Sequence, residues 1–501
     1  MDRPPPLTVL VFVVGMGSLG AEIAAVRLLS PYFGASTVIW ANTIGVVLVA
    51  LSVGYWLGGR WADRNPTTRG LCRVALLAAA LLALVPFVAR PLLDLAVDAL
   101  DEVSAGAFLG SLLAVLVLVA IPVLLLGAVS PWALRLAVRE VENAGTIAGR
   151  LYALSTAGSL VGTLLSALVL IPLVGTRRTF LLFALLIAVV AVLGLRPVRR
   201  YALAPAAIVV LLALPVGTLK ASAEGRVIYE TETEYQYARV IERDDGSRVL
   251  ELNEGQANHS VWRARTVLTN DYWDDHLTAP WATGRTTPPR RVAILGNAAG
   301  TTARAYGVLF PRTRVDAVEI DGELSDIGRR YFGMTPRPTL HVHDDDARPW
   351  LRRQDDARFD AISVDAYRQP YIPFYLTTRE FFEEARDRLA AGGVVVINVG
   401  HPEGEDDLEK VLAATLGEVF PHVLRDPVEP TNTQLVASMA PLSADRLRDA
   451  APHLPPALRP PAAGLARRLG PPLPGGDVYT DDKAPVEWLV DKSIVDYASE
   501  E

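Results

Sequence analysis

The feature that most constrains this chain is a run of long apolar stretches in its first 220 residues. A helix needs about 20 mainly apolar residues to cross the hydrocarbon core of a bilayer. Seven stretches come near that length, at residues 7–29, 38–59, 71–97, 107–129, 151–174, 179–195 and 201–219. The pattern predicts a multi-pass α-helical membrane domain of about seven helices over residues 1–220.

Small residues recur inside these stretches at a spacing that favours close helix packing. Gly54 is followed four residues later by Gly58, and Gly158 by Gly162. A glycine on every turn of one helix face lets a second backbone approach closely in lipid. We interpret these pairs as packing positions rather than as part of a substrate path.

Two charged residues, Glu22 and Arg27, lie inside the first apolar stretch. A charge within the hydrocarbon core is costly and usually faces the bundle interior or a partner of opposite sign. Arg60 and Asp63, near the end of the second stretch, are the partners that the sequence offers. We expect a structural pairing here rather than a transport site.

Composition excludes several classes of function. The net charge is -7, and no run of Lys and Arg is interleaved with aromatic residues, so no nucleic-acid partner is expected. Cys72 is the single cysteine, which rules out a disulfide framework and a thiolate metal site. The histidines are scattered rather than paired at metal-ligand spacing, and no metal is predicted.

The second half of the chain has the pattern of a mixed α/β protein. Residues 221–285 alternate in short strand-like pieces around an Asp-Asp-Gly turn and then turn helical, which predicts a small β subdomain plus a helix. Residues 286–440 alternate strand and helix, which predicts a Rossmann-like domain with a doubly wound parallel sheet. Residues 441–501 are interpreted as a C-terminal extension with a low-complexity, Ala- and Pro-rich start.

Residues 292–321 read as strand, glycine turn, helix, strand and acid, which is the order of a nucleotide-binding half-site. Gly296 and Gly300 bracket the turn. The turn has neither the GxGxxG spacing of dinucleotide enzymes nor the GxxxxGK[ST] of phosphate-binding loops. It therefore indicates no pyrophosphate site, and it suits a ligand with a small amino-alkyl and sulfonium group.

Acidic residues follow three successive predicted strands. Ligands of such sheets bind beyond the carboxyl ends of the strands, so these acids are candidate binding or catalytic groups. Glu319 stands where a carboxylate can accept both ribose hydroxyls. Asp346 is placed to accept from an adenine amino group, beside the backbone amide of Ala347, and Asp365 would face the reacting carbon.

Several segments resemble one family: the spermidine synthase-like polyamine aminopropyltransferases of the S-adenosylmethionine methyltransferase fold, in their membrane-fused form. In the second half the similar segments are LNEGQ, YWDDHLTAP, VEID, DDDA, FDAISVDAYRQPYIPFYLTTREFF and TDDKAPVE. In the first half they are LLSPYFGASTVIWANTIGV, LSVGYWLGGRWADR, GRLYALSTAGSLVGT and VLIPLVGT. The resemblance covers nearly the whole chain.

The resemblance implies transfer of an aminopropyl group from decarboxylated S-adenosylmethionine to an amine such as putrescine. The products would be spermidine or a related polyamine and methylthioadenosine. It implies that Asp365 is the general base and that Tyr272 positions the amine. It further implies cosubstrate contacts by Gln256, Gly296, Gly300, Glu319, Asp346 and Ala347, and substrate contacts by Asp274, Ala299, Arg368 and Pro373.

Two positions depart from the pattern of this family. Ala299 stands where the family has an acid in the glycine turn, and Arg368 stands where it has a second acid after Asp365. An arginine 4 Å from a cationic amine repels it by about 1 to 4 kcal/mol, for dielectrics between water and a protein surface. The departures leave open a methyltransferase using ordinary S-adenosylmethionine, an acidic or zwitterionic acceptor, or a membrane transporter or sensor that binds nucleoside without turnover.

The expected location is the cell membrane, with a small-molecule amine and the lipid bilayer as partners and a homodimer as one expected assembly. The loops at residues 60–73, 135–150 and 196–200 are basic, and the positive-inside rule places them in the cytoplasm. Seven full spans would then deliver the catalytic domain to the outer side, where nucleotide cosubstrates are scarce. We therefore expect one span to be miscounted or re-entrant and the catalytic domain to be cytoplasmic.

Overall fold

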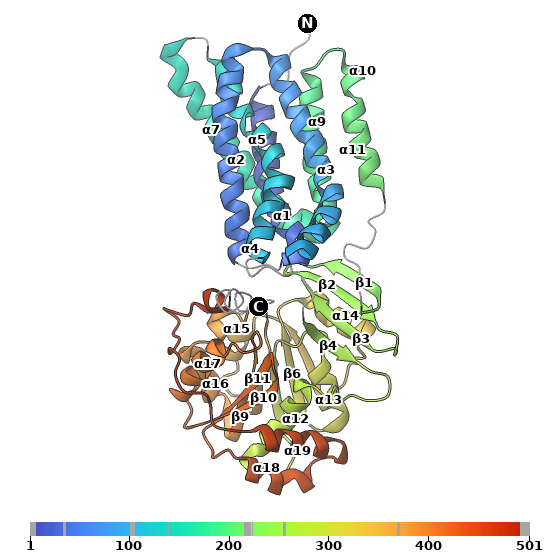
Figure 1. The fold of residues 1–501 in the computed structure, drawn as a ribbon, viewed down its shortest axis with the longest axis vertical. Coiled ribbons are helices and arrows are strands. Elements are labelled where there is room, and N and C mark those ends of the chain that lie inside the picture. The colour runs from blue at the N-terminus through green and yellow to red at the C-terminus, as the bar shows by residue number, and fades with distance from the viewer. Residues whose placement is uncertain are drawn as a thin grey trace. The chain divides into compact units, whose positions relative to one another are not determined.

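The computed structural model describes residues 7–33, 37–100, 106–138, 140–214, 222, 224–253, 257–367 and 371–490. The chain divides into two compact units (Figure 1). The helical unit comprises Met1–Ala221 and Glu230–Tyr237, and the α/β unit comprises Ser222–Tyr229 and Ala238–Glu501.

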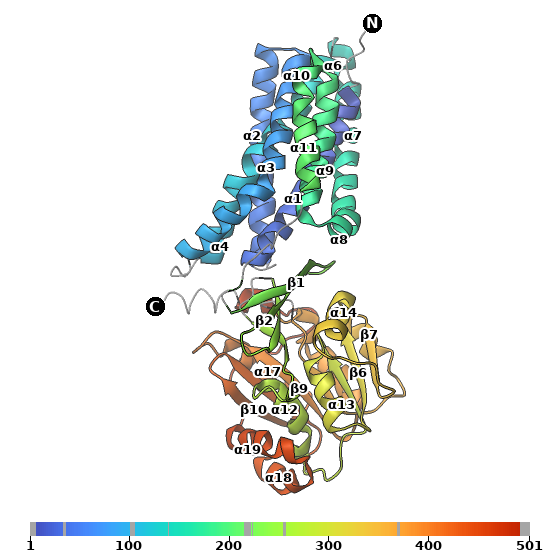
Figure 2. The same cartoon turned by 90° about the vertical axis from the view of Figure 1, so that its right-hand side faces the viewer.

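The helical unit is built from long apolar helices (Figures 1 and 2). Their bounds are α1 Leu7–Phe33, α2 Thr37–Arg64, α3 Thr68–Leu100, α4 Gly106–Val115, η1 Leu116–Ala120, α5 Ile121–Gly127, α6 Val129–Ala137, η2 Val141–Asn143, α7 Ala144–Leu165, η3 Ser166–Leu170, α8 Ile171–Val174, α9 Thr176–Leu193, α10 Val198–Tyr201 and α11 Leu203–Ala213.

Within the described residues, six helices are long and apolar enough to cross a membrane. They are Leu7–Phe33, Ile39–Arg64, Thr68–Leu93, Gly110–Ala137, Val141–Val174 and Thr176–Leu193. The segment predicted as the seventh span forms α11, which has 11 residues, and it continues into residues 215–221, outside the described part of the chain. The seventh span therefore stays a prediction.

The glycine pairs pack helix against helix, as their spacing predicts. A Cβ atom on Gly158 would overlap the carbonyl of Phe12, and one on Gly162 would overlap the carbonyl of Met16, both on α1. Gly54 meets the backbone of α5 in the same way. The close approach of α1 to α7 thus depends on residues without side chains.

The charges of the first helix do not pair as expected. Asp63 instead forms an ion pair with Arg135, at 3.1 Å, and the guanidinium of Arg60 lies over the ring of Trp56. Arg27 donates to the backbone carbonyl of Thr233, at 3.5 Å, in the stretch of the second half that belongs to the helical unit. The predicted partnership of Arg27 with Asp63 is therefore wrong, because backbone acceptors satisfy Arg27.

Glu232, in the same stretch of residues 230–237, contacts the first turn of α9. One carboxylate oxygen of Glu232 accepts from the backbone N–H of Thr176, at 2.7 Å, and from its hydroxyl, at 2.6 Å. Burial raises the pKa of Glu232, and these two hydrogen bonds oppose that rise. A carboxylate at a helix N-terminus also interacts favourably with the unpaired N–H groups there.

The α/β unit begins with a four-stranded sheet in the order β1-β2-β3-β4. The bounds are β1 Arg226–Glu232, β2 Tyr237–Glu242, β3 Arg248–Leu252 and β4 Asn258–Trp262. β2, β3 and β4 pair antiparallel, and the turn between β2 and β3 is closed by the Asp245 carboxylate, which accepts from the N–H of Ser247 at 2.8 Å.

A seven-stranded sheet follows, in the order β10-β11-β9-β8-β5-β6-β7. Its strands are β5 Arg291–Leu295, β6 Arg314–Glu319, β7 Leu340–Asp344, β8 Phe359–Val364, β9 Leu389–Gly400, β10 His422–Glu429 and β11 Asn432–Ser438. The strands from β5 to β9 pair parallel, whereas β10 and β11 pair antiparallel. The Rossmann-like fold is confirmed, and the predicted all-parallel sheet is corrected to a mixed one.

Helices cover both faces of this sheet (Figure 2). They are α12 Tyr272–Thr278, η4 Ala279–Thr283, α13 Thr301–Leu309, α14 Gly322–Tyr331, α15 Ala347–Arg352, η5 Phe374–Leu376, α16 Arg379–Asp387, α17 Asp407–Gly417, α18 Ala444–Ala450, η6 Ala451–His453, η7 Pro456–Leu458 and α19 Arg459–Arg468. Alternate residues of a strand point to opposite faces. In β5, Val292 and Ile294 accordingly join one core, and Ala293 and Leu295 join the other.

Candidate active site

The glycine turn between β5 and α13 is held against two neighbouring strands. The N–H groups of Gly296 and Asn297 both donate to the carbonyl of Val318 on β6, at 3.0 Å each. A Cβ on Gly296, whose φ is +91°, would overlap the backbone of Asp365 after β8. Only glycine fits this close approach, which fixes the spacing between the turn and Asp365.

Glu319 ends β6 and supports the same turn. One oxygen of its carboxylate accepts from the N–H of Ala298 at 2.7 Å, and the other accepts from the N–H of Asp321 at 3.1 Å. Burial raises the pKa of Glu319 to about 7. The side chain therefore shapes the turn while keeping further lone pairs for a ligand.

Asp365 is a half-buried carboxylate at the carboxyl end of β8. One of its oxygens accepts from the amide nitrogen of Asn398 at 2.9 Å, and the other accepts from the hydroxyl of Tyr272 at 3.2 Å. Burial raises the pKa of Asp365 to about 7, against the opposing effect of these hydrogen bonds. Burial likewise raises the pKa of Tyr272 well above 10, so the phenol keeps its proton. The two residues predicted as catalytic are thus in contact.

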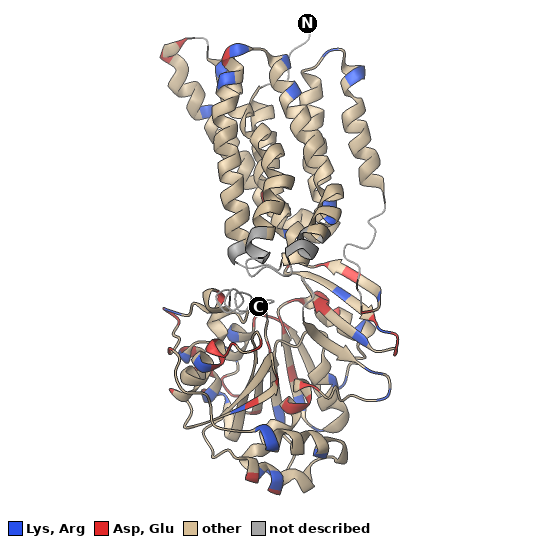
Figure 3. Ribbon diagram, viewed as in Figure 1, with Lys and Arg blue, Asp and Glu red and all other residues tan. Residues whose placement is uncertain are grey.

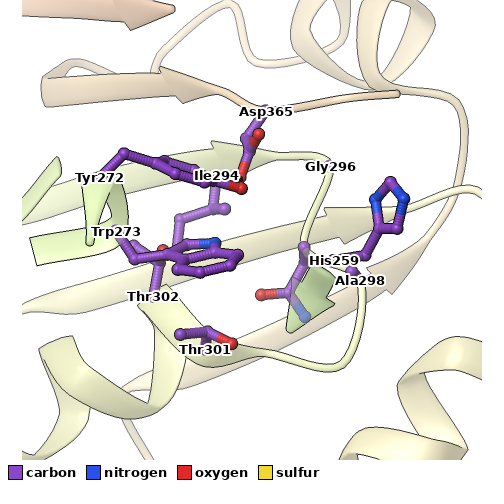
Figure 4. A pocket seen from close by; sticks show the side chains of 10 residues that line it. His259, Tyr272, Trp273, Ile294, Gly296, Ala298, Thr301, Thr302 and Asp365 are labelled. Carbon is purple, nitrogen blue, oxygen red and sulfur yellow. Dashed lines mark hydrogen bonds between the residues drawn. The ribbon is translucent and has the colours of Figure 1, made fainter. Parts of the chain in front are cut away.

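Both residues line a pocket at the carboxyl ends of β5 and β8 (Figure 4). Figure 4 shows Tyr272 and Asp365 together on one side and His259 beyond the turn from Gly296 to Ala298. The ring of Trp273 stacks on that of Tyr272, with centroids 4.2 Å apart. The lining residues are His259, Tyr272, Trp273, Ile294, Gly296, Asn297, Ala298, Thr301, Thr302 and Asp365.

Two polar atoms in this lining are buried without a hydrogen-bond partner in the described chain: Nε2 of His259 and Oδ1 of Asn297. Burial lowers the pKa of His259 to about 4, so the ring is neutral at pH 7. An unpaired buried polar atom is costly, which suits a site completed by a ligand. Sequence reasoning missed both residues, because a lone histidine in a strand and an Asn in a turn carry no spacing signal.

The other described residues predicted to bind the cosubstrate, Gly300, Asp346 and Ala347, are not among those that line the pocket. Gly300, with φ +89°, caps α13. The Asp346 carboxylate accepts from the N–H of Arg348 at 3.1 Å and from the hydroxyl of Tyr375 at 2.9 Å, at the start of α15. Ala347 is the first residue of that helix. Gln256 lies outside the described residues.

The described residues predicted to contact the substrate, Asp274, Ala299 and Pro373, do not line the pocket. The Asp274 carboxylate accepts from the N–H groups of Thr269 and Asn270, at 3.0 and 2.8 Å, and so closes the turn before α12. Ala299 is fully buried, and its N–H donates to Ser260. Pro373 precedes η5, and Arg368 lies outside the described residues.

Comparisons with known proteins identify relatives of the second half of the chain. Residues 280–435 match the spermine/spermidine synthase domain. A probable polyamine aminopropyl transferase of Bifidobacterium longum is 30% identical over 301 residues, covering 55% of this chain and 66% of that protein. The polyamine aminopropyltransferase of Vibrio vulnificus is 32% identical over 203 residues, covering 38% of this chain and 66% of that protein. The matches thus span just under two thirds of each relative.

Among solved structures, a probable spermidine synthase from Corynebacterium glutamicum aligns with a TM-score of 0.39 and 22% identity, covering 53% of this chain and 100% of that one. The family resemblance of the sequence motifs is confirmed by the domain match and by the two enzyme relatives. Residues 280–435 thus match a spermine/spermidine synthase domain, and the chain is a relative of the polyamine aminopropyltransferases.

Proposed function

We propose that this protein transfers an aminopropyl group from decarboxylated S-adenosylmethionine to an amine such as putrescine. The products are spermidine or a related polyamine and methylthioadenosine. The observation that carries the proposal is Asp365, a half-buried carboxylate in contact with Tyr272 inside the pocket. The match to the spermine/spermidine synthase domain supports the same reaction class.

The reaction needs a base more than it needs an acid. An alkyl amine is protonated at neutral pH and must lose a proton before its lone pair can attack. Asp365, with a pKa of about 7, accepts that proton as a general base. The amine nitrogen bonds to the carbon next to the sulfonium, and the carbon–sulfur bonding pair leaves with sulfur as a neutral thioether. Tyr272 keeps its proton and orients the amine.

The predicted cosubstrate residues fit a nucleoside at the strand ends. Glu319 ends β6 and accepts from the N–H of Ala298 in the glycine turn, and Asp346 lies after β7 at the same end of the parallel strands. Unpaired Oδ1 of Asn297 and Nε2 of His259 supply polar contacts that a ligand can complete. When bound, decarboxylated S-adenosylmethionine supplies the electrophilic carbon, and these residues hold it.

Asp365→Asn tests the base directly, because the change keeps the shape and removes the proton acceptor. We expect product formation, measured by mass spectrometry on detergent-purified protein, to fall at least tenfold, or about 1.4 kcal/mol of barrier. Asp326→Asn, on the exposed face of α14, is the matched control. Full activity of Asp365→Asn would exclude the base, and unchanged ligand binding and cellular phenotype would favour a transporter or sensor.

A second candidate is methyl transfer from ordinary S-adenosylmethionine. Asp365 is the single carboxylate among the described lining residues, and Ala299 brings no charge to the turn. Little in this part of the pocket would repel the carboxylate of the ordinary cosubstrate. Tighter calorimetric binding of the carboxylated form supports this candidate, and equal or weaker binding excludes it.

We propose that the helical unit lies in the cell membrane. Lys, Arg, Asp and Glu lie mainly at the ends of its helices, and few of them lie in the middle of the helices (Figure 3). Leu48, Val49, Leu168 and Val210 are each more than half exposed. Such a surface is costly in water and favourable in lipid. Retention of the protein in membranes after carbonate washing supports the proposal, and its release contradicts it.

We further propose a cytoplasmic catalytic domain, because its nucleoside cosubstrate is made there, and a homodimer as the assembly. The positive-inside rule predicts the opposite side of the membrane for this domain. Helix α9 begins beside Glu232. It is 18 residues long, and its other end adjoins the basic loop at residues 196–200, which the positive-inside rule assigns to the cytoplasm. Since Cys72 is the single cysteine, single-cysteine variants labelled from outside the cell decide the side. Light scattering decides the oligomeric state.

A further inference from the structure

The Asp365 carboxylate is held by a chain of side-chain hydrogen bonds that crosses the sheet. The amide nitrogen of Asn398 donates to Asp365 at 2.9 Å. The amide oxygen of Asn398 in turn accepts from the side-chain nitrogen of Gln434 at 2.8 Å. Asp365 follows β8, Asn398 lies on β9 and Gln434 lies on β11, so three neighbouring strands contribute one residue each.

Strand register places these side chains in line. Val364 on β8 pairs with Ile397 on β9, which brings the next residues, Asp365 and Asn398, together. Asn398 pairs directly with Gln434 across the antiparallel ladder. Directly opposed residues in a ladder point their side chains to the same face. The line is therefore a property of the sheet rather than of a loop.

Packing does not account for two amides at these positions. Asn398 is 3% exposed and stands between Ile397 and Val399 on β9, and Gln434 is 0% exposed and stands between Thr433 and Leu435 on β11. A buried amide is costly unless its polar atoms are paired, and apolar residues of similar volume would fill the space at lower cost. The geometry therefore calls for a role beyond stability.

An amide has one donor end and one acceptor end, so each hydrogen bond of the line has a direction, and Oε1 of Gln434 has no hydrogen-bond partner within the described residues. Because Gln434 donates to the oxygen of Asn398, the nitrogen of Asn398 must point to Asp365. Asp365 is then held at one oxygen by Asn398, and its other oxygen stays beside Tyr272 at the pocket. Reversal of the Asn398 amide would set its oxygen against the carboxylate.

We propose that Asn398 and Gln434 are positioning residues, which hold the Asp365 carboxylate in the one orientation that presents an oxygen to the acceptor amine. The inference rests on the proposed function, since it assigns this orientation to the general base. Neither residue touches the substrate. Gln434 acts through Asn398, and Asn398 acts through Asp365.

The titratable and charged groups around this line of hydrogen bonds determine the pKa of Asp365. Burial raises the pKa of Asp365, the hydrogen bonds from Asn398 and Tyr272 lower it, and the charge of Asp271 raises it. Tyr367 also lies close, and burial raises its pKa, so it stays neutral. On the far side Gln434 pairs in register with Asp426 of β10, which is bonded to Arg468 at 2.6 Å, and Arg468 also bonds Asp275 of α12.

Loss of the Asn398 hydrogen bond leaves the effect of burial less opposed, so the pKa of Asp365 rises further. Activity depends on the ionised carboxylate and is lost as pH falls through that pKa. The acid limb of the pH profile of kcat/KM should therefore move to higher pH in any variant that turns or removes the Asn398 donor. A role confined to fold stability would lower the yield of protein without moving this limb.

The test compares full-length Gln434→Glu, Gln434→Met and Asn398→Ser, each purified in detergent. Glu at position 434 accepts rather than donates, and so draws the Asn398 nitrogen away from Asp365. We expect Gln434→Glu to lose at least tenfold in kcat at pH 7, to move the acid limb up by about one pH unit, and to keep the cosubstrate KM within about twofold. Gln434→Met and Asn398→Ser should move the limb in the same direction by less.

The control is Ser438→Ala, at the end of β11, which removes a buried hydrogen bond to the carbonyl of Gly393 away from the site. It should lower thermal stability and leave the pH profile unchanged. A wild-type profile in folded Gln434→Met and Asn398→Ser overturns the positioning role, even if Gln434→Glu fails to fold. Activity in Asp365→Asn overturns the proposed function instead, so the two failures are distinguishable.

Discussion

Asp365 illustrates how burial tunes a residue for its reaction. A carboxylate in water has a pKa near 4 and is a weak base at neutral pH. In this site burial raises the pKa to about 7, and the partners Asn398 and Tyr272 keep it from rising higher. A base whose pKa is near the working pH combines a useful ionised fraction with a useful affinity for the proton.

Tyr272→Phe should weaken this tuning without removing the base. The change deletes the hydroxyl that donates to Asp365 at 3.2 Å. We expect kcat to fall roughly tenfold and the acid limb of the pH profile to move to higher pH, because a lost hydrogen bond to a charged group costs about 1.5 to 3 kcal/mol. Tyr229→Phe, which removes a hydroxyl bonded to Glu323 outside the pocket, is the control. Equal pH profiles for both variants would contradict this role.

Asp365→Asn should stabilise the protein at high pH. The folded state has a pKa of about 7 at this carboxyl, above the ordinary 3.8, so it binds the proton more tightly than the unfolded chain does. The wild type therefore loses stability as pH rises from about 4 to about 7, by on the order of 4 kcal/mol, and Asn does not titrate. Thermal unfolding at pH 5 and pH 8 checks this. A variant less stable than wild type by the same margin at both values contradicts it.

At the scale of single elements, the acids at the strand ends could be predicted from the sequence, whereas the antiparallel strands β10 and β11 could not. Glu319 and Asp365 follow buried apolar strands, and parallel strands bring such ends to one edge, so position alone identified them. β10 carries Pro427 and three charged residues and is mostly half-buried, so it lacks a clear period. Its place in the sheet comes from pairing with β11, which no local pattern encodes.

Some residues in and around the pocket likewise could not be predicted from the sequence. His259 reaches the site because β4 lies against the glycine turn, where the N–H of Ala299 donates to Ser260 at 3.0 Å. Asn398 and Gln434 meet through register across a ladder. Contacts between strands that are 36 residues apart depend on the assembled sheet. The sequence predicted the acids and the tyrosine, and the amides needed the fold.

Helix α7 offers a prediction about packing in the helical unit. A Cβ on Gly162 would overlap the backbone of Met16, whereas Gly149 on the same helix has open space around it. Gly162→Ala should therefore destabilise the protein in detergent by a few kcal/mol, through a steric clash. Gly149→Ala should be neutral or stabilise it by up to about 1 kcal/mol, through helix propensity. The account of the α1–α7 contact is wrong if both variants melt at the same temperature.

At the scale of the whole molecule, one chain joins an apolar helical unit to a spermine/spermidine synthase domain. Apolar length predicted the helices, because a bilayer demands about 20 such residues whatever the function. The number of spans did not follow from apolar length alone, since the stretch predicted as the seventh span forms a described helix of 11 residues.

The central claim is that the pocket around Asp365 transfers an aminopropyl group rather than a methyl group. The most direct measurement offers the purified full-length protein equal amounts of decarboxylated and ordinary S-adenosylmethionine with a panel of amines, and identifies both products by mass spectrometry. The account predicts methylthioadenosine with an equal amount of aminopropylated amine, and neither in Asp365→Asn. S-adenosylhomocysteine with a methylated acceptor would contradict it.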